Sequence, residues 1–452
     1  MSATTQQNSE FATRPWLGFS TRERVVLAVA LYFVSVSSYM DRFVIAILQE
    51  PIRAEFNLSD TELGLMSGFA FAALYSLLGI PIAWLADRSN RRYIITAALT
   101  FWSAMTALCG LGQNFTHVIL ARIGVGVGEA GMLPPTHSLV GDYFPPDGRW
   151  TAFAVLTFGN STGVALGMVG GGFIAAEFGW RIAFIAAGLP GLLMAFFVYR
   201  AIKEPRALWG YPTQSSTKSG GGFFKSSFQL LRKPTYFHIV IATTIYFFVV
   251  GGAILFIPSH MIRALNMPIE QVGLYFGLTT ASAAAIGAII GGRLADKLSK
   301  LDPRWMLRFP AIAMVVVFPL LSLFLLFDDY RIALVFFFVA WAILTMGYTP
   351  IFAAVQAIAG TTRRAIAVAF LFVSTTLIGN GLGPVATGVI SDYLAPQYGA
   401  DSLRYAMMII MALLLWSAWH FWRARLTILD DFEDDRGVDA EPNGNLESVA
   451  RE

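Results

Sequence analysis

The sequence predicts an all-α membrane protein whose twelve transmembrane helices form two similar six-helix halves. The first observation is composition: 56% of the 452 residues are hydrophobic and 13% are charged, whereas soluble proteins have about 25% charged residues. The second is that runs of about 20 apolar residues, the length that crosses a bilayer, recur along the chain. The third is an internal repeat.

The repeat is seen in two pairs of segments. The residues Leu85–Arg88 recur as Leu294–Lys297, and Gly64, Leu65 and Gly68 recur as Gly273, Leu274 and Gly277 at the same offset of 209 residues. The glycines of 159–172 resemble those of 379–388 in the same way. Many secondary transporters consist of two such halves, with the substrate site between them.

Apolar runs place the individual helices, with boundaries good to a few residues. A polar, Gly- and Ser-rich connector, 202–235, separates six helices from six. The predicted spans are 25–48, 61–86, 93–112, 116–142, 150–176, 181–201, 236–261, 269–297, 305–327, 331–358, 362–391 and 403–424. The chain is thus divided into an N-terminal segment (1–24), a first bundle (25–201), a linker (202–235), a second bundle (236–424) and an acidic tail (425–452) that we expect to be disordered.

The distribution of Lys and Arg predicts the orientation, because cytoplasmic loops are enriched in these residues. If both termini are cytoplasmic, 25 of the 32 Lys and Arg lie on that side and two, Arg42 and Arg122, lie inside spans. We therefore expect an integral protein of a bacterial-type inner (plasma) membrane with both termini inside. The remaining five of the 32 basic residues lie on the opposite, outer side, and they are Arg53, Arg181, Arg263, Arg331 and Arg404.

Residues 83–92 resemble the GxLADRxGRR motif between helices 2 and 3 of the major facilitator superfamily, with Ala83 and Asn90 where glycine is usual. The glycines from Gly163 to Gly172 resemble the glycine motif often found in antiporters of that superfamily, with Met168 in place of its proline. The resemblance implies the major facilitator fold. It also implies that helices 1, 4, 7 and 10 line a central cavity.

Within this superfamily the chain resembles the spinster-like lipid transporters. Three stretches carry the likeness: Tyr39–Arg42 in helix 1, and Arg122–Ala130 and Gly141–Phe144 in helix 4. The likeness extends over 25–205 and, in the second half, rests mainly on architecture.

Ionisable residues within spans are costly and by default mark a functional site. Asp41 and Arg42 lie in helix 1, and Arg122 and Glu129 in helix 4. At 1.5 Å per residue, Asp41 lies about 24 Å from the inner end of its helix and Arg122 about 9 Å below the outer end. The two depths are therefore similar, and Glu129 is two turns deeper on the face of Arg122.

We hypothesise that Asp41 and Glu129 exchange protons while Arg122 alternates between them and the substrate. A carboxylate that meets an arginine in one conformation and not in another would gain and lose a proton as access changes. The alternative is a static ion-pair network that only fixes helix packing. Arg42 could equally be an inert neighbour of Asp41, and we expect His137 to be structural.

Helices 7 and 10 are aromatic rather than charged, which predicts a cavity with one charged and one apolar wall. Such a cavity suits an anionic amphiphile, with its head group at Arg42 and Arg122 and its chain along Tyr246, Phe338 and Trp341. The alternative is that these aromatic side chains face lipid or pack inside the bundle.

A charge cluster on the loop after helix 2 is a candidate cytoplasmic gate. The superfamily resemblance implies that such residues latch the halves together when the outer side is open; the alternative is a solvated surface cluster. The candidate gate residues are Asp87, Arg88, Arg91 and Asp142 and, in a weaker second copy, Asp296 and Lys297.

The sequence thus predicts a monomeric secondary transporter of an anionic amphiphile, of lysophospholipid or sphingoid-phosphate type, driven by proton-coupled alternating access. Its expected partners are that substrate, protons and membrane lipid, without nucleic acid. The alternatives are a transporter of a small organic anion (carboxylate or sugar phosphate), a lipid scramblase and a receptor-like sensor. No nucleophile–base pair, nucleotide loop or metal-ligand pattern indicates an enzyme, a cofactor or a metal, and the single Cys109 excludes an intrachain disulfide.

Overall fold

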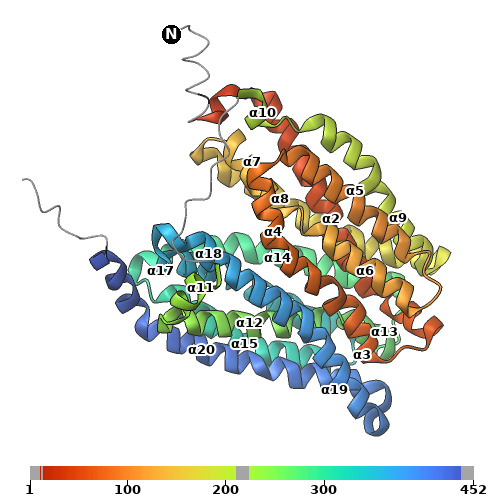
Figure 1. The fold of residues 1–452 in the computed structure, drawn as a ribbon. Coiled ribbons are helices and arrows are strands. Elements are labelled where there is room, and N and C mark those ends of the chain that lie inside the picture. Colours follow the sequence, from red (N-terminus) through yellow and green to blue (C-terminus); the bar gives the residue numbers. More distant parts are fainter. Residues whose placement is uncertain (1–10, 12–13, 210–222, 439–452) are drawn as a thin grey trace, which may run out of the picture.

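A computed structural model describes residues 11, 14–209 and 223–438. The described chain is helical, and its helices form twelve membrane-length tracts in two groups that lie side by side (Figure 1). This confirms the predicted fold class.

The first group contains six tracts. Its first three are α2 (Thr21–Phe56), the continuous stretch of α3 (Asp60–Gly64), η2 (Leu65–Phe69) and α4 (Ala70–Arg88), and α5 (Arg91–Cys109). The remainder comprises α6 (Phe115–Glu129) with α7 (Leu133–Tyr143), then α8 (Arg149–Ala165), η4 (Leu166–Gly170) and α9 (Gly171–Ala201), with short 3-10 turns η1 (Pro15–Gly18) and η3 (Pro146–Gly148).

Two short helices, α10 (Pro205–Trp209) and α11 (Phe223–Leu231), lie in the connector between the groups. The second group begins with α12 (Pro234–Ile254) and α13 (Ile257–Arg263), followed by α14 (Ile269–Leu301) and α15 (Trp305–Leu326). It ends with α16 (Tyr330–Met346) and α17 (Tyr348–Ile358), then α18 (Gly360–Ser374), η5 (Thr375–Leu382) and α19 (Gly383–Tyr398), and, after the turn η6 (Gly399–Asp401), α20 (Ser402–Val438).

Local sequence explains where the first helices begin and where α9 is divided. Ser20 and Glu23 form a capping box at the start of α2, and Ser59 and Glu62 form another at the start of α3. Gly179 has φ +83°, a conformation that favours glycine, and it breaks α9 between the fifth and sixth spans.

Three tracts contain a π-helical turn. These turns are η2, η4 and η5, in the second, fifth and eleventh spans. Each coincides with the glycine motifs noted in the sequence, and such turns often occur at functional sites. The fourth and tenth spans instead break, after Glu129 and at Gly347 respectively.

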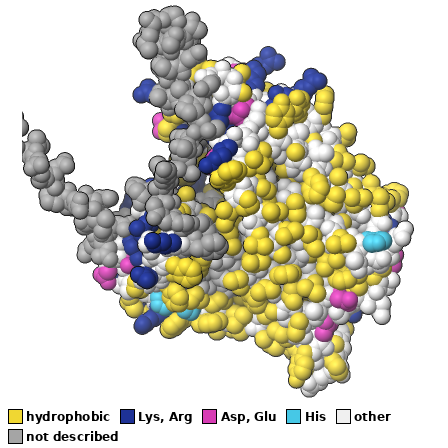
Figure 2. All heavy atoms as spheres, viewed as in Figure 1, with side chains coloured by type: hydrophobic (Ala, Val, Ile, Leu, Met, Phe, Trp, Pro, Cys, Tyr) yellow, Lys and Arg dark blue, Asp and Glu magenta, His cyan; other side chains and the backbone are white. Residues whose placement is uncertain are grey.

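On the face that Figure 2 shows, apolar side chains cover most of the helix surface, and Lys and Arg gather toward the end near the N-terminus. Within the described ranges, nine continuous helical stretches are long and apolar enough to cross a membrane. Two of them, Pro146–Trp209 and Arg363–Phe432, each contain two of the predicted spans, and α5 supplies the remaining one.

We call the end that carries the start of α2, the connector and the end of α20 the linker face, and the opposite end the far face. The last helix differs from expectation on the linker face: α20 continues to Val438, so the first part of the segment expected to be disordered is helical. Residues 439–452, the rest of that segment, lie outside the described part of the chain.

Candidate functional site

The charged residues of helices 1 and 4 form one cluster inside the first bundle. Arg42 on α2 pairs with Glu129 at the end of α6, with Nε 2.6 Å from Oε2. Ser38, one turn before Arg42, donates to the same oxygen at 2.8 Å. Glu129 is fully buried, whereas the Arg42 side chain is 25% exposed. The arginine is therefore the member of the pair that a molecule from outside the bundle can reach.

Asp41 and Arg122 meet at the depth that the helix lengths predict, but through a different contact. Arg122 donates from Nη1 to the backbone carbonyl of Asp41 at 3.1 Å. Both side chains are buried, and the carboxylate of Asp41 lies near the side chains of Thr106 and Trp102 without a hydrogen bond of standard geometry to any described residue. Because burying a charged carboxylate without a hydrogen-bond partner is costly, Asp41 does not stabilise the packing of these helices.

Aromatic rings surround Arg42. Its guanidinium lies 4.8 Å from the ring centres of both Phe71 and Tyr75 and 5.5 Å from that of Tyr39. These distances allow cation–π attraction, which holds the charge of a partly exposed arginine in a fixed place.

The second bundle contributes aromatic side chains opposite this cluster. Phe372 of α18 approaches Tyr75 across the interface, with ring centres 5.9 Å apart. Tyr348 of α17 packs against Phe247 of α12, with ring centres 5.8 Å apart. Tyr246 is buried and packs edge-on against Phe247, with ring centres 5.0 Å apart, so its predicted place along a substrate chain stays a prediction.

The structure does not bring the other two predicted aromatic residues to the cluster. Trp341 stacks on Phe337 at 5.7 Å and lines a small gap inside the second bundle between α12, α15, α16 and α20. Phe338, next to Phe337, is half-buried, with no ring contact among the described residues. Their predicted role along a substrate chain stays a prediction.

Two gate candidates of the first half, the buried Arg91 and the half-buried Asp142, lie in one cluster on the linker face. Arg91 is fully buried and pairs with Asp142 at 2.7 Å, as the sequence suggests. It also pairs with Glu204, and its Nη1 donates to Ser138 at 2.7 Å. All of these contacts lie within the first bundle and its connector, so here the cluster fixes α5 against α7 rather than joining the halves.

The remaining gate candidates are exposed or half-buried. Arg88 lies over the ring of Trp84 at 4.2 Å, and the backbone carbonyl of Asp87 accepts a hydrogen bond from Arg206. In the second copy Asp296 and Lys297 are exposed on α14. His137, expected to be structural, packs its ring edge-on against Phe153 at 4.9 Å.

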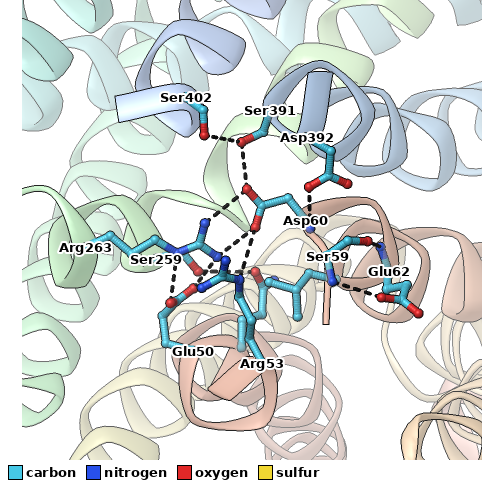
Figure 3. A network of polar contacts seen from close by, with 12 residues as sticks. Glu50, Arg53, Ser59, Asp60, Glu62, Ser259, Arg263, Ser391, Asp392 and Ser402 are labelled. Atoms are coloured by element: carbon cyan, nitrogen blue, oxygen red, sulfur yellow. Dashed lines mark hydrogen bonds and ion pairs between the residues drawn. The ribbon is translucent and has the colours of Figure 1, made fainter. Parts of the chain in front are cut away.

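A second charged network, which sequence reasoning did not predict, joins the two bundles on the far face (Figure 3). Arg263 at the end of α13 donates from Nε and Nη2 to Glu50 of α2 at 2.8 and 2.6 Å. It also donates from Nη1 and Nη2 to Asp60 of α3 at 3.0 and 2.7 Å. One guanidinium from the second bundle thus holds two carboxylates of the first, each by two hydrogen bonds.

Helix α19 adds contacts from the second bundle to the start of α3. Asp392 accepts the backbone N–H groups of Asp60 and Thr61, both at 2.9 Å, and a carboxylate at a helix N-terminus is favoured by the helix dipole. Ser391 donates to Asp60 at 2.6 Å. The helices approach closely, since a Cβ on Gly388 would lie 2.2 Å from the carbonyl oxygen of Asp60.

The far-face network lacked a sequence signal because its partners are distant in the chain and no motif links them. Asp60 and Asp392 are separated by 332 residues, and Arg263 and Glu50 by 213. Hydrogen bonds and ion pairs that join the two bundles through described side chains all lie on the far face.

A family model and the similar proteins all point to one family. Residues 31–384 match the family model described as Major Facilitator Superfamily. The chain is 33% identical over 395 residues to an MFS-type efflux pump of Mycolicibacterium smegmatis, with 87% of this chain and 91% of that protein covered. It is 27% identical to protein spinster homolog 1 of Xenopus laevis, with 87% and 78% covered.

A solved structure is also similar over nearly its whole length. It is a bacterial homologue of the human lysosomal transporter Spinster in an inward-facing, unoccupied conformation. The match has a TM-score of 0.80 at 28% identity and covers 91% of this chain and 99% of that one.

Proposed function

The chain belongs to the Major Facilitator Superfamily and resembles its spinster members, and from that premise we propose that it is a proton-coupled transporter of an anionic amphiphile. The observation that carries the proposal is the partly exposed Arg42, paired with the buried Glu129 and framed by aromatic rings. A cation beside apolar surface suits a molecule with an anionic head and a hydrocarbon chain.

The conformation supports alternating access. With the far face held together by Arg263, Asp60 and Asp392, the substrate site between the bundles can open only toward the linker face. We assign the linker face to the cytoplasm and the membrane to the cell's inner membrane, because Lys and Arg concentrate there. The similarity to an inward-facing spinster homologue supports this assignment.

The coupling step follows from one ion pair. A proton that reaches Glu129 neutralises the carboxylate and releases Arg42, which then binds an anionic head group. When the substrate leaves, Arg42 returns and Glu129 loses its proton. Asp41, whose carboxylate makes no hydrogen bond of standard geometry to a described residue, is the second proton carrier, while Arg122 holds the backbone of α2 beside it.

The test is the flux of a labelled lysophospholipid in proteoliposomes, with and without a pH gradient. Glu129→Gln cannot exchange a proton, so we expect it to lose gradient-driven accumulation while still allowing slow equilibration. The matched control is Glu177→Gln, which makes the same change at an exposed residue and should transport as the wild type does.

Accumulation by Glu129→Gln equal to wild type would contradict the coupling role. Lipid movement that only equilibrates, equally in all three proteins, would indicate a scramblase. Movement of a small organic anion but not of the lysophospholipid would overturn the proposed substrate class.

A further inference from the structure

A groove on the outside of the second bundle has no role in the proposed transport cycle. It lies between α15 and α20, has a volume of about 370 Å³ and is lined by apolar side chains. Two small, buried residues, Ala311 and Ala418, form its floor. The walls are exposed, and they consist of Ile312, Val315, Val316, Leu415, Trp419 and Trp422.

An arginine of α20 lies over the ring of each of the two tryptophans in the wall. The guanidinium of Arg425 lies 3.9 Å from the ring centre of Trp422, and that of Arg423 lies 5.8 Å from the ring centre of Trp419. Both arginines follow the tryptophans toward the end of α20 at the linker face. The groove therefore has an apolar body and a basic end.

The two charges are not neutralised within the part of the chain that the structure describes. Neither Arg423 nor Arg425 forms an ion pair there, and the buried Nε of Arg425 has no hydrogen-bond partner. Arg308 at the start of α15 differs, since it pairs with Asp302 at 3.0 Å. Neither arginine donates a side-chain hydrogen bond to a described residue, and both guanidinium groups lie over tryptophan rings of the groove wall, so their terminal nitrogens are available beside the groove.

We propose that this groove binds an anionic phospholipid of the leaflet at the linker face, with one acyl chain between α15 and α20 and the phosphate at Arg423 and Arg425. An acyl chain matches the apolar lining, and tryptophans with adjacent basic residues are typical of the membrane–water interface. Arginine suits a phosphate because its planar fork donates two parallel hydrogen bonds. The site is separate from the Arg42 cluster, so it does not depend on the proposed function.

The experiment counts lipids retained by the full-length protein in native mass spectrometry. Phosphatidylglycerol is compared with phosphatidylcholine of the same acyl chains. We expect phosphatidylglycerol to bind more tightly to the wild type. Each arginine near an anionic head group contributes about five-fold in affinity, so Arg423→Gln with Arg425→Gln should weaken phosphatidylglycerol binding about 30-fold.

Three further measurements separate this site from a general charge effect. Arg363→Gln with Arg364→Gln removes the same charge from exposed positions on the same face and should leave binding unchanged. Arg423→Lys with Arg425→Lys, which keeps the charge and guards against a folding defect, should keep most of the preference. Glycerol phosphate, a head group without chains, should not compete.

The proposal is overturned if the double glutamine variant retains phosphatidylglycerol as the wild type does. It is also overturned if the control pair weakens binding equally, or if glycerol phosphate displaces the lipid, since the groove would then play no part.

Discussion

The two ends of the molecule use buried charge in opposite ways. On the far face, Arg263 of the second bundle binds Glu50 and Asp60 of the first, so the ion pairs join the bundles. On the linker face, Arg91 binds Asp142 and Glu204 within one bundle and its connector. The difference teaches that the same interaction can either close one side of the molecule or only stabilise a bundle, depending on where the partner lies.

The largest expected effect comes from Arg91→Gln. Breaking a buried pair leaves carboxylates without a counter-charge and costs about 3–5 kcal/mol, so the thermal unfolding temperature of the purified protein should fall sharply. The separation of the bundles on the far face, measured between spin labels, should not change. If the far-face separation changed while the unfolding temperature did not, Arg91 would act between the bundles, and the proposed difference between the two ends would be wrong.

Arg263→Gln should have the converse effect. Because its guanidinium is 13% exposed, we expect a somewhat smaller cost of about 2–3 kcal/mol. This cost should destabilise the conformation with a closed far face and leave the fold of each bundle intact. Spin-label distances across the far face should lengthen. Arg331→Gln, at an exposed arginine of the same face, is the control; equal distances in both variants would show that Arg263 does not hold this side closed.

Gly388→Ala tests the close packing beneath the far-face charges. The added Cβ would lie 2.2 Å from the carbonyl oxygen of Asp60, so α19 and α3 must separate, at a cost of about 1–3 kcal/mol. We expect far-face labelling of an introduced cysteine to become faster. Gly292→Ala, where the Cβ would meet no atom within 4 Å, should label at the wild-type rate; if both variants behave alike, the helix contact is not part of the closure.

The smallest effect is expected for Asp296→Asn with Lys297→Gln. Both side chains are exposed in this conformation, and surface changes of this kind alter stability by within about 0.5 kcal/mol. The unfolding temperature should therefore stay at the wild-type value. A large decrease would mean that the second copy of the loop motif already has a structural partner.

The sequence predicted the fold because each span is encoded locally, by about 20 apolar residues and by breaks such as Gly179. Helix rise and antiparallel direction predicted that Asp41 and Arg122 lie at similar depth, and the family resemblance implied that the faces of helices 1 and 4 meet. The specific pairing was not predictable. Arg42 rather than Arg122 meets Glu129, and this depends on the rotation of each helix, which only packing decides.

The far-face network and Glu204 were missed for a different reason. Arg263 and Asp392 lie at helix ends, where charged residues are ordinary, and their partners come from the other bundle. Glu204 lies in the connector next to Lys203 and resembles a solvated residue in the sequence. A single sequence gives no distance between such positions, so the contacts become visible only in three dimensions.

The most direct test measures distances across both ends of the same protein, in a Cys109→Ser background. One spin-label pair is placed at the exposed Gln113 and Gln397 on the far face, and another at the exposed Thr151 and Lys300 on the linker face. For alternating access we expect added lysophospholipid to lengthen the far-face distance and shorten the linker-face distance in the same fraction of molecules. If the far face opens while the linker face stays open, or if the two distances change independently, the account is wrong.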